Sequence, residues 1–414
     1  MVGPIGADLE VPSYAGFITV NERFNSNLFF WFVPSLRDPR NSPVVLWMQG
    51  GPGTSSLLGF FSEHGPYVLS PDGKKAQWRN LTWAQRYSML YVDQPVGAGF
   101  SFTESNEGYA RNMNDIARDM LEFVQQFFTL FSEQAKNDLY LAGESYAGKY
   151  VPAVGAALHE SANNARVKVN FRGIAFGNGF TDPVNMIDFG EFLHNIGLMR
   201  RADALKVTEA GKSAVGLIRD GRLSDAAFLM DRTIFGLLTK DTFFKNVTGY
   251  DYYYNYLIDK QPRSLKSYEG FVTSPEIRRS IHVGHLEFHT SRTVVAEYLT
   301  EDIMRSAVKQ FTVVLQKGYK VLVYSGNLDI CVPTTQTERF LSKLKWSHAD
   351  HWKQTPHHIW WSADGQSPLG YKKTIANLNF MAIRNGGHVL PFDQPVVMFD
   401  LITAFIDDTA PFGR

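Results

Sequence analysis

Short apolar runs, each closed by turn-forming residues, recur in the first quarter of the chain and predict β-strands. The runs are rich in β-branched and aromatic residues, which favour strands over helices. They cover residues 17–20, 28–33, 44–48 and 89–92. The last two runs are apolar throughout, as expected for strands that are buried on both faces of a sheet.

Apolar residues then recur at helical spacing from 113 to 135. The steps of three or four residues between Met113, Ile116, Met120 and Phe123 predict an amphipathic helix. Further strand-like runs follow at 138–142, 173–176, 320–324 and 380–383. Strands that alternate with helices predict an α/β fold, with a mostly parallel sheet and helices on its faces.

The stretch from 183 to 290 has a different pattern. It lacks long buried strand runs and carries helical patterns around 204–217 and 225–238. We therefore predict a mainly helical insertion at 183–290 within a core formed by 1–182 and 291–414. We expect this insertion to cover the functional site as a lid.

The composition indicates a globular protein without net charge. Of the 414 residues, 44% are hydrophobic, which is enough for a sizeable core. The 41 Lys and Arg residues balance the 41 Asp and Glu residues, so we expect no nucleic-acid partner. No apolar run approaches the roughly 20 residues that cross a bilayer, and we expect no membrane span.

The chain has one cysteine, Cys331, which excludes an intrachain disulfide and a zinc site built from several thiolates. Asp8 and Glu10 fall where a signal peptide needs its apolar stretch, so we expect no signal peptide in the chain shown. The protein is therefore either intracellular or shown here in a processed, mature form.

The segment Gly143-Glu144-Ser145-Tyr146-Ala147-Gly148 has the context of a nucleophile elbow, because it follows a predicted strand and precedes a helical stretch at 149–159. In such an elbow a serine lies on a tight turn, and small residues two positions before and after it let the backbone bend. Ala147 takes the place of the more usual glycine. The amides at the start of the helix favour a developing oxyanion, so Ser145 is a candidate nucleophile.

Two later loops carry the groups that such a serine needs. Asp329 and His388 each follow a predicted strand. A serine needs a base to accept its proton, and the imidazole needs a carboxylate to fix its tautomer and stabilise its cation. The order Ser145, Asp329, His388 is that of the α/β-hydrolases, and the glycine-rich Gln49–Gly53 lies where these folds place a second oxyanion donor.

Four motifs in this order resemble those of the serine carboxypeptidases. They are Trp47–Gly53 with Ser55 and Ser56, Asp93–Ser101, Gly143–Gly148 and Asn385–His388. The resemblance covers nearly the whole chain, from about residue 9 to about residue 408. The chain is most similar to the vitellogenic carboxypeptidase-like branch, at Gln49, Glu63–Tyr67, Ile281–Gly284 and Leu390–Pro395.

The resemblance implies an α/β-hydrolase fold and a serine-type carboxypeptidase, which removes C-terminal residues from peptides through an acyl-enzyme. It implies that Ser145 is the nucleophile, His388 the base and Asp329 the residue that orients the base. The backbone N–H groups of Gly51 and Tyr146 would form the oxyanion hole. The expected substrates are peptide or protein C-termini, no cofactor is expected, and the oligomeric state stays open.

The family's pattern also places Gln49, Gly50, Glu63 and Glu144 where the free carboxylate of the substrate binds. Two carboxyls close together cannot both ionise cheaply, so we expect Glu63 and Glu144 to share a proton and to donate it to the substrate. Gln49 replaces the asparagine that is common elsewhere in the family, which keeps the amide donor on a longer stem.

The same pattern implies that Leu58, Ser62 and Val389 border the pocket for the terminal side chain, which suits an apolar residue. A shared proton in the binding site predicts peptidase activity that peaks on the acid side of neutrality. Because His388 must be neutral to act as a base, we also expect burial to lower its pKa in the free enzyme, against the effect of Asp329.

Two other functions stay open. One is a catalytically silent relative that acts as a binding or protective protein, although the intact Ser145, Asp329 and His388 argue against it. The other is acyl transfer to an alcohol or amine with the same three residues.

Several further segments carry no pattern that indicates chemistry. His282, His285 and His289 lack a zinc-binding pattern, and we expect no metal site. Asp93-Gln94-Pro95 is expected to shape a turn below the site, and Gly177-Asn178-Gly179 lacks the context of a dinucleotide-binding loop. The polar stretch with several histidines and tryptophans at 346–361 is expected to be a surface excursion.

Asn80 and Asn246 each begin a sequon and are candidate glycosylation sites in a secretory compartment. The family is typically secretory or lysosomal, so the expected localisation is the secretory pathway, with the protein lysosomal or secreted. The family's usual disulfides cannot form with Cys331 alone, which argues against a secretory localisation.

Overall fold

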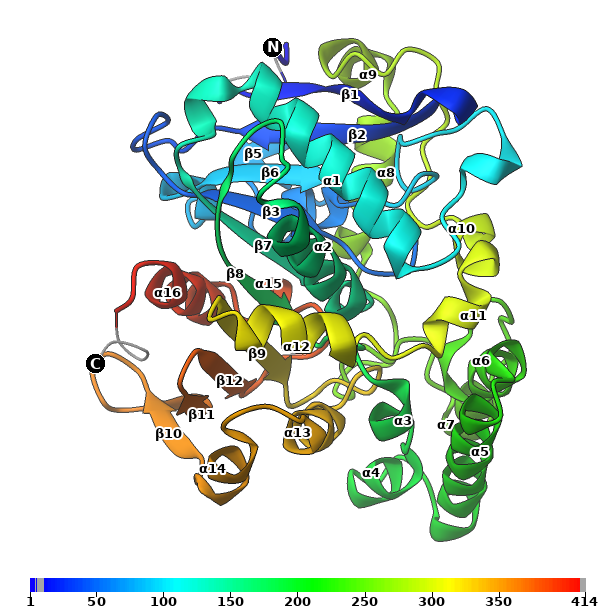
Figure 1. Ribbon diagram of the computed structural model, residues 1–414. Helices are drawn as coiled ribbons and strands as arrows, with labels where there is room; N and C mark the ends of the chain where they lie inside the picture. The colour runs from blue at the N-terminus through cyan, green and yellow to red at the C-terminus, as the bar shows by residue number, and fades with distance from the viewer. Residues whose placement is uncertain (4, 6–10, 410–414) are drawn as a thin grey trace.

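A mixed sheet of ten strands forms the centre of the molecule (Figure 1). The computed structural model describes residues 1–3, 5 and 11–409. The strands are β1 (Tyr14–Asn21), β2 (Ser26–Val33), β3 (Val44–Met48), β6 (Ser88–Val92), β7 (Asp138–Glu144), β8 (Asn170–Gly177), β9 (Lys320–Gly326), β10 (His358–Trp361), β11 (Pro368–Ile375) and β12 (Leu378–Ile383). Their order across the sheet is β1-β2-β6-β3-β7-β8-β9-β12-β11-β10.

The six central strands, from β6 to β12, are parallel to one another. The two outer strands at each edge pair antiparallel. All eight strands predicted from apolar runs are present, and the predicted α/β fold with a mostly parallel sheet is confirmed. A separate two-stranded ribbon is formed by β4 (Tyr67–Leu69) and β5 (Ala76–Trp78).

Alternate side chains of the central strands belong to two different cores. On β3, Val44 and Leu46 pack in one core and Val45 and Trp47 in the other, because successive residues of a strand point to opposite faces. The first core includes residues of α1 (Met113–Leu130), α2 (Ala147–Ser161), α12 (Val308–Gln316) and α13 (Thr334–Lys343). The second includes residues of α16 (Pro395–Ile406), α8 (Ser267–Val272) and α9 (Pro275–Ser280). The strands are buried on both faces for this reason.

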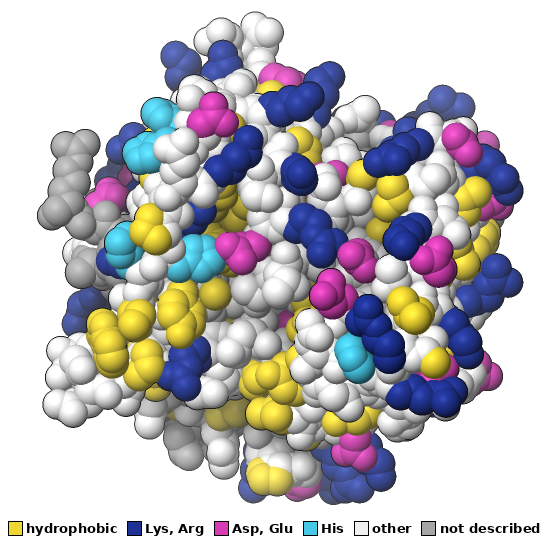
Figure 2. All heavy atoms as spheres, turned by 90° about the horizontal axis from the view of Figure 1, so that it is seen from below, with side chains coloured by type: hydrophobic (Ala, Val, Ile, Leu, Met, Phe, Trp, Pro, Cys, Tyr) yellow, Lys and Arg dark blue, Asp and Glu magenta, His cyan; other side chains and the backbone are white. Residues whose placement is uncertain are grey.

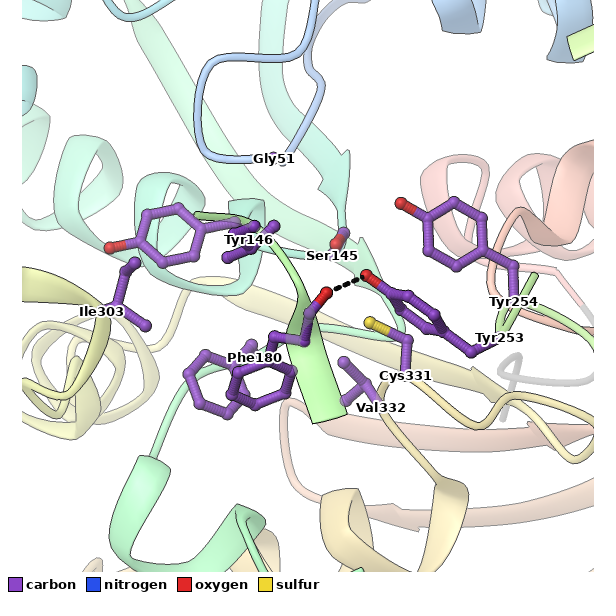
Figure 3. Close-up of a pocket in the computed structure, with 11 residues that line it drawn as sticks. Gly51, Ser145, Tyr146, Phe180, Tyr253, Tyr254, Ile303, Cys331 and Val332 are labelled. Atoms are coloured by element: carbon purple, nitrogen blue, oxygen red, sulfur yellow. Dashed lines mark hydrogen bonds between the residues drawn. The ribbon is translucent and has the colours of Figure 1, made fainter. Parts of the chain in front are cut away.

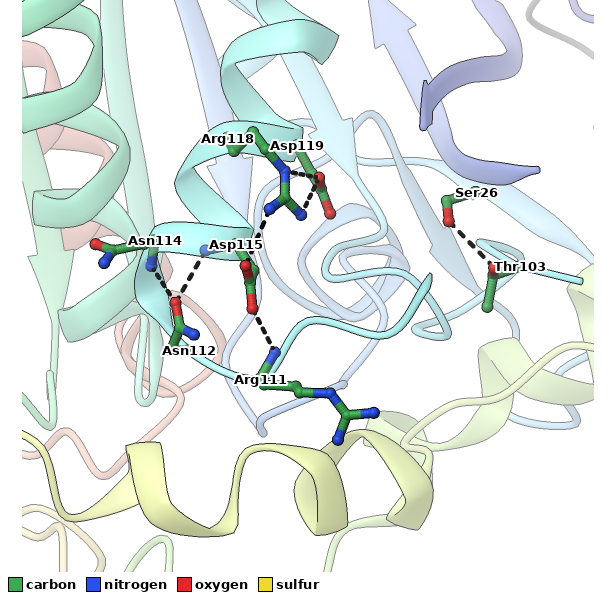
Figure 4. A network of polar contacts seen from close by, with 8 residues as sticks. All are labelled: Ser26, Thr103, Arg111, Asn112, Asn114, Asp115, Arg118 and Asp119. Carbon is green, nitrogen blue, oxygen red and sulfur yellow. Dashed lines mark hydrogen bonds and ion pairs between the residues drawn. The ribbon is translucent and has the colours of Figure 1, made fainter. Parts of the chain in front are cut away.

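Helix α1 begins at a capped and charge-balanced first turn (Figure 4). The Asn112 side chain accepts hydrogen bonds from the backbone N–H groups of Asn114 and Asp115, which otherwise lack helical partners. Arg118 bridges Asp115 and Asp119 at 3.0 Å each. The helix ends at Leu130, five residues before the end predicted from the apolar spacing.

Helices fill the chain between β8 and β9, and no strand occurs in that described stretch. They are α3 (Pro183–Met186), α4 (Gly190–Asn195), α5 (Arg201–Arg219), α6 (Leu223–Met230), α7 (Phe243–Thr248), α8, α9, α10 (Thr293–Tyr298), α11 (Thr300–Ile303) and α12. Figure 1 shows α3 to α7 gathered on one side of the molecule, whereas α8 and α9 lie beside β1 and β2. The long excursion is closed at its neck, where Ala307 N donates to Thr181 O at 2.9 Å.

The stretch 346–361 is more ordered than the expected surface excursion. It contains the short helix α14 (Ala349–Gln354) and strand β10, which pairs with β11 at the edge of the sheet. Trp352 and Trp360 are buried, while Trp361 is half-exposed. The expectation is therefore wrong for 358–361. Only four residues form this strand, and their flanks are polar, so no continuous apolar run marks it in the sequence.

Charges of both signs are dispersed over the surface. Figure 2 shows Lys and Arg side chains intermingled with Asp and Glu over the face that is seen, with no region of a single sign. This distribution agrees with the formal net charge of zero.

Candidate active site

Ser145 lies on a sharp turn between β7 and α2, with a backbone φ of +63°. A non-glycine residue rarely adopts a positive φ, so the surrounding structure holds the turn in place. The Ser145 N–H donates to Gly177 O at 2.9 Å. A Cβ atom on Gly143 would lie 2.7 Å from the Cβ of Ala147 and 2.4 Å from Met48 O. The turn therefore needs small residues on both sides of the serine, and alanine is small enough.

His388 and Asp329 form a buried hydrogen-bonded pair. His388 Nδ1 lies 2.7 Å from Asp329 Oδ2, and the two side chains are 2% and 0% exposed. Asn178 Nδ2 also donates to Oδ2 at 2.5 Å, and the backbone N–H of Cys331 donates to Oδ1 at 2.7 Å. Both carboxylate oxygens are thus satisfied, so Asp329 can stay ionised in a buried place.

The second nitrogen of His388 is free. Its Nε2 is buried and has no hydrogen-bond partner in the described part of the chain. Because Nδ1 must carry the proton that bonds to the Asp329 carboxylate, Nε2 of the neutral ring is an acceptor. This is the state that a base needs.

The pKa of His388 lies above its ordinary value. Burial lowers it, but the charge and hydrogen bond of Asp329, with smaller contributions from Glu144 and Asp393, outweigh burial and raise it. The expectation that burial lowers this pKa in the free enzyme is therefore wrong. Hydrogen bonds to both oxygens of Asp329 explain why the pKa is raised, because they stabilise a negative charge 2.7 Å from the His388 ring.

Two backbone N–H groups beside Ser145 are unpaired. The N–H groups of Gly51 and Tyr146 donate no hydrogen bond within the described residues. The two backbone segments are very close, since a Cβ on Gly50 would lie 2.6 Å from Tyr146 N. Gly51 has a φ of +112°, which favours glycine there. The geometry places two free donors beside the serine, and their role as an oxyanion hole stays a prediction.

Gln49, Glu63 and Glu144 form a buried polar cluster next to the serine. Trp47 Nε1 donates to Gln49 Oε1 at 2.9 Å, which fixes the amide so that Gln49 Nε2 donates to Glu144 Oε1 at 2.6 Å. The two glutamates are each 1% exposed. Glu144 Oε2 and both Glu63 carboxyl oxygens have no hydrogen-bond partner among the described residues.

Burial raises the pKa of Glu63 to about 8, although Glu144, the charge of Arg79 and Gln49 counteract it. Burial and the charge of Glu63 raise the pKa of Glu144 well above its usual range. A pair of this kind holds a proton near neutral pH because two buried carboxylates repel one another. Unpartnered oxygens and a retained proton make the cluster suited to bind a carboxylate.

Asp93 anchors the loop that carries these groups. Its Oδ1 accepts from Ser55 Oγ at 2.6 Å and from Ser56 N at 2.9 Å, and its Oδ2 accepts from Phe100 N at 3.0 Å. Ser56 Oγ in turn accepts from Gln49 N at 3.0 Å. The interpretation of Asp93-Gln94-Pro95 as a structural turn below the site agrees with these contacts.

Sequence reasoning missed Asn178, which it considered only within a rejected nucleotide-binding pattern. Asn178 follows β8, and β8 is the neighbour of β9, the strand that precedes Asp329. Its position after a strand was the available signal. Its partner lies 151 residues away, and that separation cannot be read from one sequence.

An apolar pocket opens beside Ser145. Figure 3 shows Tyr146 and Ile303 on one side of the serine and Tyr253 and Tyr254 on the other. The lining residues are Gly51, Ser145, Tyr146, Phe180, Phe235, Leu237, Tyr253, Tyr254, Ile303, Cys331 and Val332. Cys331, a free thiol, is therefore in the wall of the site, as expected from its place after Asp329.

A second small apolar cluster lies near Val389. It contains Val389, Tyr252 and Leu265, with Leu58 packed against it. Ser62 Oγ donates to Ser264 O at 3.3 Å. The three residues expected to border a terminal side-chain pocket thus contact the same part of the insertion, around residues 252–265.

Two further findings concern the described residues only. No group of three or more His, Cys, Asp or Glu side chains among them is arranged to hold a metal ion. None of their helices combines the length and hydropathy that a bilayer span requires.

Comparison with known proteins supports the resemblance seen in the motifs. The family model described as serine carboxypeptidase matches residues 4–408. A venom serine carboxypeptidase of Apis mellifera is 42% identical over 95% of this chain and 84% of its own length. The probable serine carboxypeptidase CPVL of Homo sapiens is 42% identical over 98% of this chain and 85% of its own.

The vitellogenic carboxypeptidase of Aedes aegypti is 40% identical over 95% of this chain and 83% of its own. The crystal structure of Kex1(delta)p, a prohormone-processing carboxypeptidase from Saccharomyces cerevisiae, has a TM-score of 0.82 at 21% identity. It covers 96% of this chain and 91% of its own, and shows the same fold. This chain belongs to the serine carboxypeptidase family, on the branch that includes the vitellogenic and CPVL carboxypeptidases.

Proposed function

We propose that Ser145, His388 and Asp329 carry out the carboxypeptidase reaction of this protein. The observation that carries the proposal is the free, buried Nε2 of His388, whose other nitrogen is bound to a fully satisfied Asp329. His388 Nε2 takes the proton of Ser145 Oγ as that oxygen attacks the carbonyl carbon of the last peptide bond. The same proton goes to the leaving amine, and the C-terminal amino acid departs.

Water then completes the cycle. His388 takes a proton from water, the hydroxide attacks the acyl-enzyme ester on Ser145, and Ser145 Oγ regains a proton as the shortened peptide leaves. In both steps the carbonyl oxygen becomes negative. The unpaired N–H groups of Gly51 and Tyr146 are suited to stabilise it, since donors fixed before the reaction need no reorganisation.

The carboxylate of the substrate binds at the Glu63 and Glu144 pair with Gln49 and Gly50. While it holds its shared proton, the pair donates a hydrogen bond to the substrate carboxylate. Once both glutamates are ionised, the pair repels that carboxylate. Peptide binding should therefore weaken as pH rises through the upper of the two raised pKa values of the pair. The raised pKa of His388 sets the acid limb, which moves the expected optimum from the acid side towards neutrality.

Two apolar regions would take the side chains on either side of the cleaved bond. The pocket with Phe180, Phe235 and Ile303 lies on the side of Tyr146 and suits the penultimate residue. The cluster around Val389 and Leu265 suits the terminal residue. Both favour apolar side chains, because charged groups would lose their hydration there without a partner.

Three further assignments rest on the family and on exposure. Asn80 and Asn246 are exposed, as glycan acceptors must be, and we assign both as glycosylation sites of a protein in the secretory pathway. Residues 183–256 act as the lid over the site. The later part of the insertion packs in the second core instead, through Tyr268 and Phe271.

Labelling with a fluorophosphonate tests the proposed function. The folded wild-type protein should form an adduct on Ser145 and release amino acids one at a time from peptide C-termini. Ser145→Ala should abolish labelling and lower kcat by at least about 10⁴-fold. An unlabelled wild-type serine would favour the silent binding protein, whereas products formed on a competing alcohol or amine instead of water would favour acyl transfer.

A further inference from the structure

A five-residue segment of the insertion, Tyr252–Tyr256, lies between the loops that carry Asp329 and His388. We call it the strap. On the first side its backbone flanks Asp329. Tyr256 N donates to Leu328 O at 3.0 Å, and Ile330 N donates to Tyr253 O at 3.2 Å. The residues immediately before and after Asp329 are thus both bonded to the strap.

The strap also holds the loop of His388. The backbone N–H of His388 donates to Tyr254 O at 2.6 Å. The rings of Tyr254 and His388 are in contact, with centroids 4.5 Å apart and planes tilted by 35°. A Cβ on Gly387 would lie 2.2 Å from Tyr254 O, so glycine is required where the strap passes the loop.

One side chain extends this contact. Asn255, which is 7% exposed, donates from Nδ2 to Asp393 Oδ2 at 3.0 Å. The same oxygen accepts from Gly387 N at 2.7 Å. Leu257 N donates to Asn255 Oδ1 at 3.0 Å, which fixes the orientation of the amide. The Asp393 carboxylate therefore links Asn255 to Gly387, the residue before His388.

From these contacts we propose that the strap is a positioning element for the triad, and that Asn255 and Asp393 are its positioning side chains. The proposal rests on the function proposed above. Asp329 and His388 lie on loops after different strands, 59 residues apart. The strap contacts both loops at once, so it fixes the imidazole relative to its carboxylate and to Ser145.

The strap also borders the substrate. Tyr253 and Tyr254 line the pocket beside Ser145, and Tyr253 Oη donates to Phe235 O at 2.8 Å across that pocket (Figure 3). A misplacement of about 1 Å in a catalytic group can reduce the rate by about 100-fold. Loss of the Asn255 contact should therefore reduce kcat more than it changes KM.

Kinetics of Asn255→Ala, Asp393→Asn and the double variant test the proposal. We expect Asn255→Ala to lower kcat by about 10- to 100-fold with KM within threefold of wild type. The double variant should lose no more than the worse single variant, because both act through the same contact. Tyr319→Phe is the matched control, since it removes a hydrogen bond outside the strap, between the Tyr319 hydroxyl and His159 Nδ1 at 2.9 Å, and should leave kcat unchanged.

A spectroscopic readout separates the strap from the proposed function. The Nδ1 proton of His388 that bonds to Asp329 gives a downfield ¹H NMR signal that requires no turnover. This signal should be shifted or lost in Asn255→Ala and kept in Tyr319→Phe. Thermal unfolding shows that a variant is folded, and Asn255→Asp replaces Asn255→Ala if the alanine variant is not.

The outcomes are distinct. A wild-type protein that hydrolyses peptides through Ser145, with an Asn255→Ala variant whose kcat stays within twofold and whose signal is unchanged, would overturn the strap and keep the function. A wild-type protein without peptidase activity whose His388 signal is still lost in Asn255→Ala would overturn the function and keep the strap.

Discussion

At the scale of single residues, the proposed chemistry depends on groups that are left without partners in buried positions. Glu144 has one oxygen bound by the Gln49 amide, and its second oxygen and those of Glu63 have no partner in the described residues apart from the proton that the two carboxyls share. Buried polar atoms are nearly always paired, so exceptions indicate a place for a ligand. Here the missing partner is a negatively charged group that accepts the proton of the pair.

The substitution Glu144→Gln tests this proton. The wild-type kcat/KM for a peptide should fall by up to about tenfold per pH unit as pH rises above the upper pKa of the pair, because the pair then loses its proton. A glutamine at 144 donates at every pH and should flatten this alkaline limb. The matched C-terminal amide, which carries no anion, should show a weaker limb in the wild-type enzyme. Profiles of kcat/KM against pH for both substrates provide the measurement.

Glu160→Gln is the control for this prediction, since Glu160 is exposed on α2, and its profile should equal that of the wild-type enzyme. The acid limb should be common to the peptide and the amide, because His388 serves both. Coincident alkaline limbs for peptide and amide, unchanged by Glu144→Gln, would refute the shared proton.

The sequence allowed the residues of the site to be predicted where they belong to a recognisable motif. It did not allow the contacts that support them to be predicted. Ser145, Asp329 and His388 follow predicted strands, and the carboxyl ends of parallel strands meet at one edge of a sheet. Asn178 and Asn255 act through partners more than 130 residues away, so their roles depend on tertiary contacts. The sign of the His388 pKa shift was mispredicted because it depends on how well Asp329 is satisfied.

At the scale of elements, a buried ion pair joins α2 to the region of α11. Lys149 Nζ lies 3.3 Å from Asp302 Oδ2, and the two side chains are 0% and 2% exposed. Asp302 also accepts from Tyr146 Oη at 3.0 Å and from Met113 N, the first residue of α1, at 3.2 Å. Three helices are thus held together next to Tyr146, whose N–H we propose for the oxyanion hole.

The substitution Lys149→Met keeps the volume of the side chain and removes its charge. It leaves the Asp302 carboxylate buried without its cation, so we expect the free energy of unfolding to fall by about 3–5 kcal/mol. Lys212→Met is the control, because Lys212 forms an exposed pair with Glu209 and its loss should leave the stability nearly unchanged. Urea unfolding at pH 6 measures both, and equal effects would show that the buried pair adds nothing.

Elements were predictable where burial is uniform along them. The apolar runs locate the central strands to within a few residues, because these strands are buried on both faces. The edge strand β10 was missed because only one of its four side chains, Trp360, is buried. The end of α1 was placed too late because Phe131, beyond the last helical turn, still packs against the core.

At the scale of the whole molecule, several buried carboxyls have raised pKa values. Burial raises the pKa of Glu63 to about 8, that of Asp93 to about 7 and that of Asp119 to about 6. A group whose pKa is higher in the folded than in the unfolded chain stabilises the fold at low pH. That contribution is lost as pH rises from about 4 to the folded pKa.

We therefore expect the free energy of unfolding to fall between pH 5 and pH 8, because these carboxyls outnumber His64, whose lowered pKa acts in the opposite direction. Urea unfolding across this range measures the slope. Asp119→Asn, on α1, removes one of these carboxyls and should reduce the slope, mostly below about pH 6. Stability that is constant or rises over this range would contradict the prediction.

The closed neck of the β8–β9 excursion bears on how such a protein can diversify. Because Thr181 and Ala307 are hydrogen-bonded to each other, the chain leaves the core and returns to it at one point. A chain segment inserted between two adjacent points can be lengthened, shortened or exchanged during evolution with little effect on the sheet. The strap limits that freedom, because it lies inside the exchangeable piece. A replacement of the excursion can therefore change which peptides are accepted only if it keeps a segment that bonds to the loops of both Asp329 and His388.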